Sequence, residues 1–244
     1  MITQYLRPTS LDEAAALLAH RDVEILAGGT SLNASPPHAP VTAVDLQALD
    51  LDGIDSQNGA VRIGATARLQ ELVDSPLVPP VLRELARREA PNTIRNAATV
   101  GGTIGVGDPE SELLAGLLAY GTVVTLARSG SSTEQPLDNL LDAGIPVGSI
   151  ITSVTVPTEG RAAADRTGRT PMDRPIVTAV AYADGGDVRL ALTGVTSRPV
   201  LVDPARIGEL DPPADFRGSA EYRLHLAGVL ATRVLTALDG GDGQ

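Results

Sequence analysis

Apolar residues recur at helical spacing in several segments of the chain. The first follows Ser10, which lies three residues before Glu13 in the spacing of a capping box. Its apolar positions are Leu11, Ala14, Ala15 and Leu18. We therefore predict an amphipathic helix over residues 10–20. The same periodicity predicts helices over residues 68–74, 80–89, 109–119 and 219–238.

Strands are predicted where short apolar and β-branched runs end at glycine, proline or polar turns. Such runs occupy residues 23–27, 41–46, 61–65, 122–127, 149–156, 176–183 and 188–195. An Asp-Gly-Gly-Asp turn joins the last two runs, which predicts a β-hairpin.

Three stretches show neither pattern. Residues 92–107 are rich in glycine and residues 128–148 are polar, so we expect loops there. Residues 159–174 are polar and rich in arginine, and we interpret them as a solvated connector between two lobes. The arginines of this connector are Arg161, Arg166, Arg169 and Arg174.

Composition places the chain among globular proteins. Its 244 residues suffice for one large domain or two to three small packed lobes, and 43% of them are hydrophobic. No apolar run approaches the roughly 20 residues that span a bilayer, so we expect no membrane span. The first residues lack the pattern of a signal peptide, and we expect a cytoplasmic location.

Charge and cysteine content exclude several classes of function. The chain has no cysteine, so it cannot itself hold an iron–sulfur cluster or a thiolate zinc site. Its three histidines are scattered, which argues against a metal hydrolase. Nineteen basic and thirty acidic side chains give a net charge of −11, which argues against nucleic acid as a partner because the phosphate backbone is also negative.

Two glycine loops carry the candidate chemistry. The first, residues 27–31, follows a predicted strand, and the second, residues 99–103, lies about seventy positions later. Adjacent glycines allow close backbone approach to a bulky anion, and their amides and neighbouring hydroxyls can donate hydrogen bonds to a pyrophosphate. The loop residues are Ala27, Gly28, Gly29, Thr30, Ser31, Thr99, Val100, Gly101, Gly102 and Thr103. The alternative is that each glycine pair only forms a tight turn.

Neither loop matches the common nucleotide signatures. The chain contains no G-x-x-x-x-G-K-[ST] motif, and no G-x-G-x-x-G opens a helix after a strand. A P-loop ATPase and a Rossmann dehydrogenase are therefore disfavoured.

At these residues the chain resembles the FAD-binding medium subunit of molybdenum hydroxylases, of the carbon monoxide dehydrogenase and xanthine dehydrogenase type. The resemblance lies in residues 5–14 (YLRPTSLDEA), 26–32 (LAGGTSL), 94–102 (IRNAATVGG), 108–113 (DPESEL) and 221–230 (EYRLHLAGVL). These segments occur in the family's order and span nearly the whole chain. Among these segments, residues 94–102 are the most specific to the family.

The resemblance implies a site and a fold. The two glycine loops would wrap the FAD pyrophosphate, and Glu112 occupies a position where the family usually has an aspartate that contacts the cofactor. The implied fold is α+β, with a two-lobed FAD-binding domain of the PCMH type: residues 1–50 form lobe 1 and residues 51–160 form lobe 2. A small C-terminal α+β domain, residues 161–244, would contain a three-stranded antiparallel sheet.

The resemblance also implies a function, electron transfer within a molybdopterin-dependent hydroxylase or dehydrogenase. Electrons would pass from a molybdopterin large subunit, through an iron–sulfur small subunit, to FAD and then to NAD or another acceptor. Two alternatives remain open: a free-standing FAD-dependent oxidoreductase acting on a small molecule, and a degenerate, non-catalytic family member. Flavin content and copurification with the expected partner subunits would separate the three.

Overall fold

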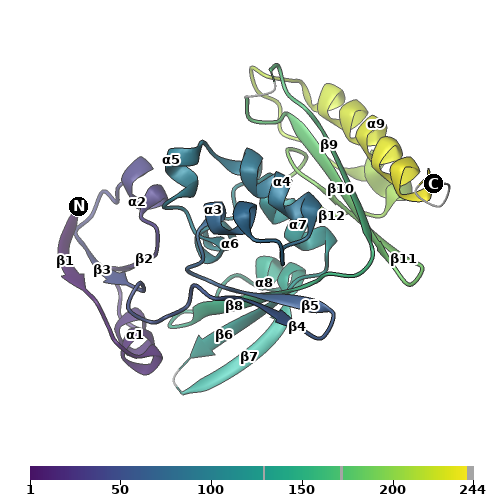
Figure 1. Cartoon of the computed structure of the whole chain (residues 1–244). Helices are drawn as coiled ribbons and strands as arrows, with labels where there is room; N and C mark the ends of the chain where they lie inside the picture. The colour runs from purple at the N-terminus through teal and green to yellow at the C-terminus, as the bar shows by residue number, and fades with distance from the viewer. Residues whose placement is uncertain (129, 171–172, 241–244) are drawn as a thin grey trace.

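The computed structural model describes residues 1–128, 130–170 and 173–240, and contains three sheets that follow one another along the chain (Figure 1). The first is a small parallel sheet in the order β1-β3-β2. Its strands are β1 (Ile2–Leu6), β2 (Val23–Leu26) and β3 (Val41–Asp45). Two helices connect them, α1 (Leu11–Leu18) and α2 (Thr30–Ala34).

Helix α1 forms as the capping box predicts. The Ser10 side chain accepts a hydrogen bond from the amide of Glu13, and the Glu13 carboxylate accepts one from the amide of Thr9. Ala14, Ala15 and Leu18 are buried on one face of α1, where they pack with residues of β3 and with Ile150 of the next sheet. This small apolar cluster joins the first sheet to the second.

The second sheet is antiparallel, in the order β4-β5-β8-β6-β7. The strands are β4 (Ile54–Gln57), β5 (Ala60–Gly64), β6 (Val123–Arg128), β7 (Ser131–Pro136) and β8 (Ile150–Pro157). Its helices are α3 (Leu69–Asp74), α4 (Pro80–Glu89), α5 (Asn92–Arg95), α6 (Val100–Val106), α7 (Glu112–Ala119) and α8 (Leu137–Ala143). The main hydrophobic core lies between this sheet and these helices.

Helix α7 is buried all round because other elements cover every side of it. Helix α4 contacts one side and strand β10 (Val177–Asp184) contacts another. At Gly116 a β-carbon would lie 2.5 Å from Cδ1 of Leu85 and 2.7 Å from Cδ2 of Leu82, so a larger residue would force these side chains of α4 to shift. This buried helix fixes the C-terminal domain against the main core.

The third sheet is antiparallel and has the order β12-β11-β10-β9. It comprises β9 (Arg161–Thr167), β10, β11 (Asp187–Leu192) and β12 (Val200–Leu201). Alternate residues of β10 enter different cores: Ala179 and Ala181 pack toward α9 (Ala220–Asp239), whereas Val180 and Tyr182 join the main core. A 3-10 turn, η1 (Pro204–Glu209), precedes α9.

The prediction of a three-stranded C-terminal sheet is wrong, because the third sheet has four strands. The hairpin of β10 and β11 forms as expected, with Asp184 opposite Asp187. The predicted connector, however, begins with strand β9, which pairs along β10 from Val177 to Ala183. The β9 sequence, RAAADRT, lacks a run of large β-branched residues, and tertiary pairing rather than propensity determines its conformation.

The two loops expected over residues 92–107 and 128–148 also contain regular structure. The first holds α5 and α6, and the second holds β7 and α8. Glycines 101, 102 and 105 lower the helix propensity of α6, but Thr99 caps it and its apolar side packs on the main core. The lobe boundaries at residues 50 and 160 stay predictions, although no strand of the three sheets crosses either position in the described chain.

Candidate functional site

The first glycine loop connects β2 to α2. Gly29 adopts a left-handed conformation, with φ of 71°, and stands at the N-cap of α2 without a side-chain hydrogen bond. Within the described part of the chain, the amides of residues 28–32 donate no hydrogen bond. Because the loop is only partly exposed, these amides form a compact group of donors that suits an anion.

The second glycine loop is organised differently. Thr99 is buried and caps α6, and its hydroxyl accepts a hydrogen bond from the Gly102 amide at 3.1 Å. The amides of Val100 and Gly101 donate to carbonyl oxygens of Ala67 and Ala65, and that of Thr103 donates to the Thr99 carbonyl. The amides of this loop therefore stabilise the fold, and its other polar groups are the Thr99 and Thr103 hydroxyls.

The two loops lie against each other. A β-carbon at Gly28 would lie 1.8 Å from the carbonyl oxygen of Ala97 and 3.2 Å from Cα of Ala98, the two residues that directly precede Thr99. Figure 1 shows α2, which follows the first loop, near α5, the short helix that precedes the second loop. Only glycine permits this approach, so segments seventy residues apart in sequence form one surface.

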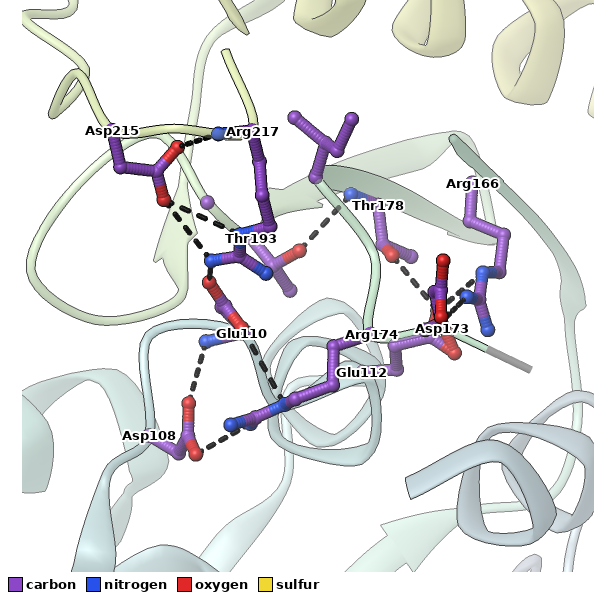
Figure 2. A network of polar contacts seen from close by, with 12 residues as sticks. Asp108, Glu110, Glu112, Arg166, Asp173, Arg174, Thr178, Thr193, Asp215 and Arg217 are labelled. Carbon is purple, nitrogen blue, oxygen red and sulfur yellow. Dashed lines mark hydrogen bonds and ion pairs between the residues drawn. The ribbon is translucent and has the colours of Figure 1, made fainter. Parts of the chain in front are cut away.

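Glu112 lies elsewhere, at the start of α7, where the main core meets the third sheet. Its carboxylate accepts a hydrogen bond from the Thr178 hydroxyl at 3.0 Å and pairs with Arg166 at 3.3 Å. Figure 2 shows these side chains converging from α7, β10 and β9. The second carboxylate oxygen, Oε2, is buried and has no hydrogen-bond partner among the described residues.

Burial raises the pKa of Glu112, and the Arg166 charge and the Thr178 hydroxyl act in the opposite direction. A carboxylate with one unsatisfied buried oxygen is costly, so it marks a position where an additional donor or a proton would be stabilising. The structure thus places Glu112 in a polar cluster between domains, and a contact with the cofactor stays a prediction.

Arg166 and Arg174 of the predicted connector bind carboxylates, and Arg166 is enclosed, which corrects its interpretation as a solvated residue. Arg161, Arg169 and Arg174 are exposed, as a solvated connector predicts. Arg174 pairs with Asp108 at 2.5 Å and with Glu110 at 3.4 Å, and Arg217 also pairs with Glu110 (Figure 2). A cavity of about 400 Å³ adjoins this network and has Glu110, Arg174 and Arg217 in its lining. Arg166, Arg174 and Thr178 are interface residues that the sequence did not indicate. The acidic run DPESE, residues 108–112, and the arginine-rich segment 159–174 are complementary in charge, and this was a signal for the contact.

Other classes of site receive no support from the described residues. Within residues 1–128, 130–170 and 173–240, no three histidine, cysteine or acidic side chains are grouped so that they could hold a metal ion. None of the helices in these ranges combines the length and apolar character needed to cross a bilayer.

The sequence matches a family model described as the FAD binding domain in molybdopterin dehydrogenase, over residues 1–159. The chain belongs to this family. The resemblance to the FAD-binding medium subunits of the carbon monoxide dehydrogenase type is thereby confirmed.

Relatives extend over the whole chain. An uncharacterized protein of Escherichia coli K12, YgfM, is 33% identical over an alignment of 248 positions, gaps included, that covers 94% of each protein. The carbon monoxide dehydrogenase medium chain of Hydrogenophaga pseudoflava is 28% identical over an alignment of 279 positions, gaps included, that covers 96% of each.

Solved structures agree with this assignment. A structure of carbon monoxide dehydrogenase from Hydrogenophaga pseudoflava superposes with a TM-score of 0.89 at 26% identity and covers 97% of both chains. Quinoline 2-oxidoreductase from Pseudomonas putida 86 gives a TM-score of 0.85 at 25% identity, with 98% of this chain covered and 97% of the other.

Proposed function

We propose that this medium subunit binds FAD, with the pyrophosphate at the junction of residues 27–31 and 99–103, and transfers electrons through it. The observation that carries the proposal is the contact of Gly28 with Ala97 and Ala98, which brings the two glycine loops together. A dinucleotide cofactor requires a site for its diphosphate, and the family's FAD-binding domain covers both loops.

The donor groups of the first loop fit a diphosphate. Its amides at residues 28–32 donate no hydrogen bond among the described residues, and the left-handed Gly29 directly precedes the first turn of α2. Backbone donors also suit a chain with a net charge of −11, because they bind an anion without requiring lysine. Hydrogen bonds to a charged group contribute about 1.5–3 kcal/mol each, so a few of them suffice.

The second loop contributes shape and the Thr99 hydroxyl rather than amides, because the Thr103 hydroxyl already donates to the Thr99 carbonyl oxygen. Thr99 uses its hydroxyl oxygen to hold the Gly102 amide, which leaves the hydroxyl proton for a ligand. A β-carbon at Gly102 would lie 2.9 Å from Thr99 Oγ1, so this glycine leaves room for the hydroxyl, and one at Gly105 would contact nothing within 4 Å.

A bound flavin would supply the redox chemistry, since it exchanges electrons with one-electron and two-electron partners. The chain's own residues hold and orient it, and Glu112 of the domain interface is proposed to contact it. We propose an iron–sulfur small subunit as the electron donor, a molybdopterin large subunit as the site of substrate oxidation, and NAD or another acceptor downstream. Relatives carry medium-chain names in carbon monoxide and glyceraldehyde dehydrogenases, which supports this assembly.

The pyrophosphate site is tested by titrating the FAD-free chain with FAD, FMN and riboflavin. We expect FAD to bind most tightly, because only FAD carries the diphosphate. Gly29→Asp is expected to weaken FAD binding at least about tenfold, or about 1.4 kcal/mol, by placing a negative charge beside the phosphates. Gly29→Asn is the matched control, since both side chains tolerate a left-handed backbone. Equal binding by the Asp and Asn variants would argue against phosphate at this loop.

The assembly is tested by purifying the tagged full-length chain from its own cells. Copurification of one protein with iron–sulfur absorbance and another with molybdenum is expected. If the chain holds flavin, copurifies with no such partners and oxidises a small molecule by itself, the result would instead support the free-standing oxidoreductase. A flavin-free chain that binds neither cofactor nor partners would support the degenerate family member.

A further inference from the structure

Glu89 places a second buried carboxyl group beside Glu112. Glu89 is the last residue of α4, and its carboxyl group points into the protein although the residue as a whole is partly exposed. Its Oε2 accepts a hydrogen bond from the Leu113 amide at 3.0 Å, and the Ser111 hydroxyl also bonds to the carboxyl group. Ser111 caps α7, so Glu89 binds the first turn of the helix that begins with Glu112.

The two carboxyl groups share little positive charge. Arg166 of β9 pairs with Glu112 at 3.3 Å, and Oε2 of Glu112 is buried without a partner among the described residues. Asp108, from the turn before α7, adds a further negative charge near Glu89. On α4 itself, Arg88 pairs with Glu84, and its charge also stabilises the Glu112 carboxylate. Arg95 of α5 donates to the carbonyl oxygens of Arg87 and Ala90, not to Glu89.

This crowding raises the pKa of Glu89 to about 7, chiefly through burial, with additional repulsion from Asp108 and Glu112. The hydrogen bonds from Leu113 and Ser111 act in the opposite direction. Burial also raises the pKa of Glu112. Glu89 is therefore poised to gain or lose a proton near neutral pH when the charge in its surroundings changes.

We propose that Glu89, coupled to Glu112 across the first turn of α7, is a proton-linked positioning residue that takes up a proton when electrons enter the cofactor site. This inference rests on the proposed function, because Glu112 is the residue proposed to contact the cofactor. Added negative charge at the cofactor acts on Glu112 and Glu89 through the buried start of α7. The resulting repulsion favours the neutral carboxyl group.

The electrons and the proton of this step have different sources. Electrons come from the iron–sulfur partner or from a chemical reductant, and the proton comes from water. One O–H bond forms on the Glu89 carboxylate, and it breaks again when the electrons leave the site. Glu89 thus compensates charge without reacting with the cofactor itself.

The test is the pH dependence of the flavin midpoint potential in the FAD-loaded full chain, measured with redox dyes. Glu89→Gln retains an oxygen that accepts from Leu113 but cannot ionise. Below the Glu89 pKa, the two proteins are expected to have similar potentials, because Glu89 is then neutral. Above a pH of about 7, the variant is expected to have the more positive potential, and the difference between the two proteins should grow as the pH rises through that value.

Glu134→Gln, on the exposed strand β7, is the control and should follow the wild type at every pH. Infrared difference spectra on reduction should show a protonated carboxyl signal in the wild type that Glu89→Gln lacks. Parallel potential curves for the wild type and Glu89→Gln, with no carboxyl signal, would overturn the inference and leave FAD binding intact. A wild-type chain that takes up no FAD would overturn both proposals.

Discussion

At the residue scale, three residues have unusual features: one lacks a β-carbon, one has an unpartnered oxygen, and one has a buried carboxyl group. Gly28 has no β-carbon, and this lets its backbone touch the Ala97 carbonyl. Glu112 has one buried oxygen without a partner in the described chain, and Glu89 is a carboxyl group kept from water. Such features lower stability and are retained where they serve a site.

Glu89 gives a prediction about stability and pH. Its pKa is about 7 in the folded chain, compared with a usual value of 4.5. The folded state therefore binds the proton more tightly, so this group's contribution to stability is full below pH 4.5 and is lost as the pH rises to about 7.

Chemical denaturation at several pH values, in the FAD-free protein, measures this contribution. The stability of the wild type relative to Glu89→Gln should fall across that interval and then level off. A constant difference between the two proteins would show that Glu89 has an ordinary pKa.

At the element scale, α6 shows how glycines in one helix serve different purposes. A β-carbon at Gly101 would lie 2.9 Å from both the β-carbon and the carbonyl oxygen of Ala65, so this glycine allows α6 to pack on the end of β5. Gly105 is exposed and a β-carbon there would touch nothing within 4 Å. The first glycine is required by packing, and the second is not.

Alanine substitutions at these two positions should have opposite effects. Gly105→Ala is expected to raise the free energy of unfolding by about 0.5–1 kcal/mol, because glycine is the poorer helix former. Gly101→Ala is expected to lower it by about 1–3 kcal/mol through overpacking. Urea unfolding of the FAD-free chain measures both. Stabilisation by Gly101→Ala would mean that α6 does not pack tightly on Ala65.

Local patterns predicted the elements whose own residues determine them. Helix α4 has the bounds expected from its periodicity, and α1 and the β10–β11 hairpin follow from a capping box and a turn. Strand β9 and helix α6 could not be predicted in this way. Alanine and charged residues form β9 because β10 lies beside it, and glycines form α6 because a cap and the core hold it.

The same distinction, between local patterns and contacts made by the fold, applies to the candidate site. The sequence singled out both glycine loops, because adjacent glycines with hydroxyl neighbours are visible in a short window. It could not show that the amides of the second loop donate within the fold, or that Arg166 reaches Glu112 across the domain interface. Those facts depend on segments more than thirty residues apart, and only the folded chain brings them together.

At the scale of the whole molecule, buried helix α7 and the charged residues at its start join the FAD-binding domain to the C-terminal domain. Of the described ion pairs of this interface, Arg166–Glu112 is the most enclosed, with exposed side-chain fractions of 14% and 2%, and Arg217–Glu110 follows with 16% and 14%. Arg174, in contrast, is 57% exposed. Exposed ion pairs contribute about 0–1 kcal/mol, so we expect the enclosed pair to matter more.

Arg166→Met should therefore lower the free energy of unfolding by about 3–5 kcal/mol, because it leaves the Glu112 charge buried without its partner. Arg174→Ala should lower it by less than about 1 kcal/mol. Adding Glu112→Gln to Arg166→Met should recover much of the loss. Thermal and urea unfolding measure these differences. Equal effects of the two arginine variants would contradict the assignment of Arg166–Glu112 as the stronger ionic contact.

Two glycine loops that are distant in the sequence are proposed to form one FAD site. The most direct test is the visible spectrum of the purified chain, together with mass analysis of the released ligand. The account predicts a flavin spectrum, FAD as the released ligand, and loss of both in Gly29→Asp. A folded, colourless wild-type chain that acquires no flavin on incubation with FAD would contradict it.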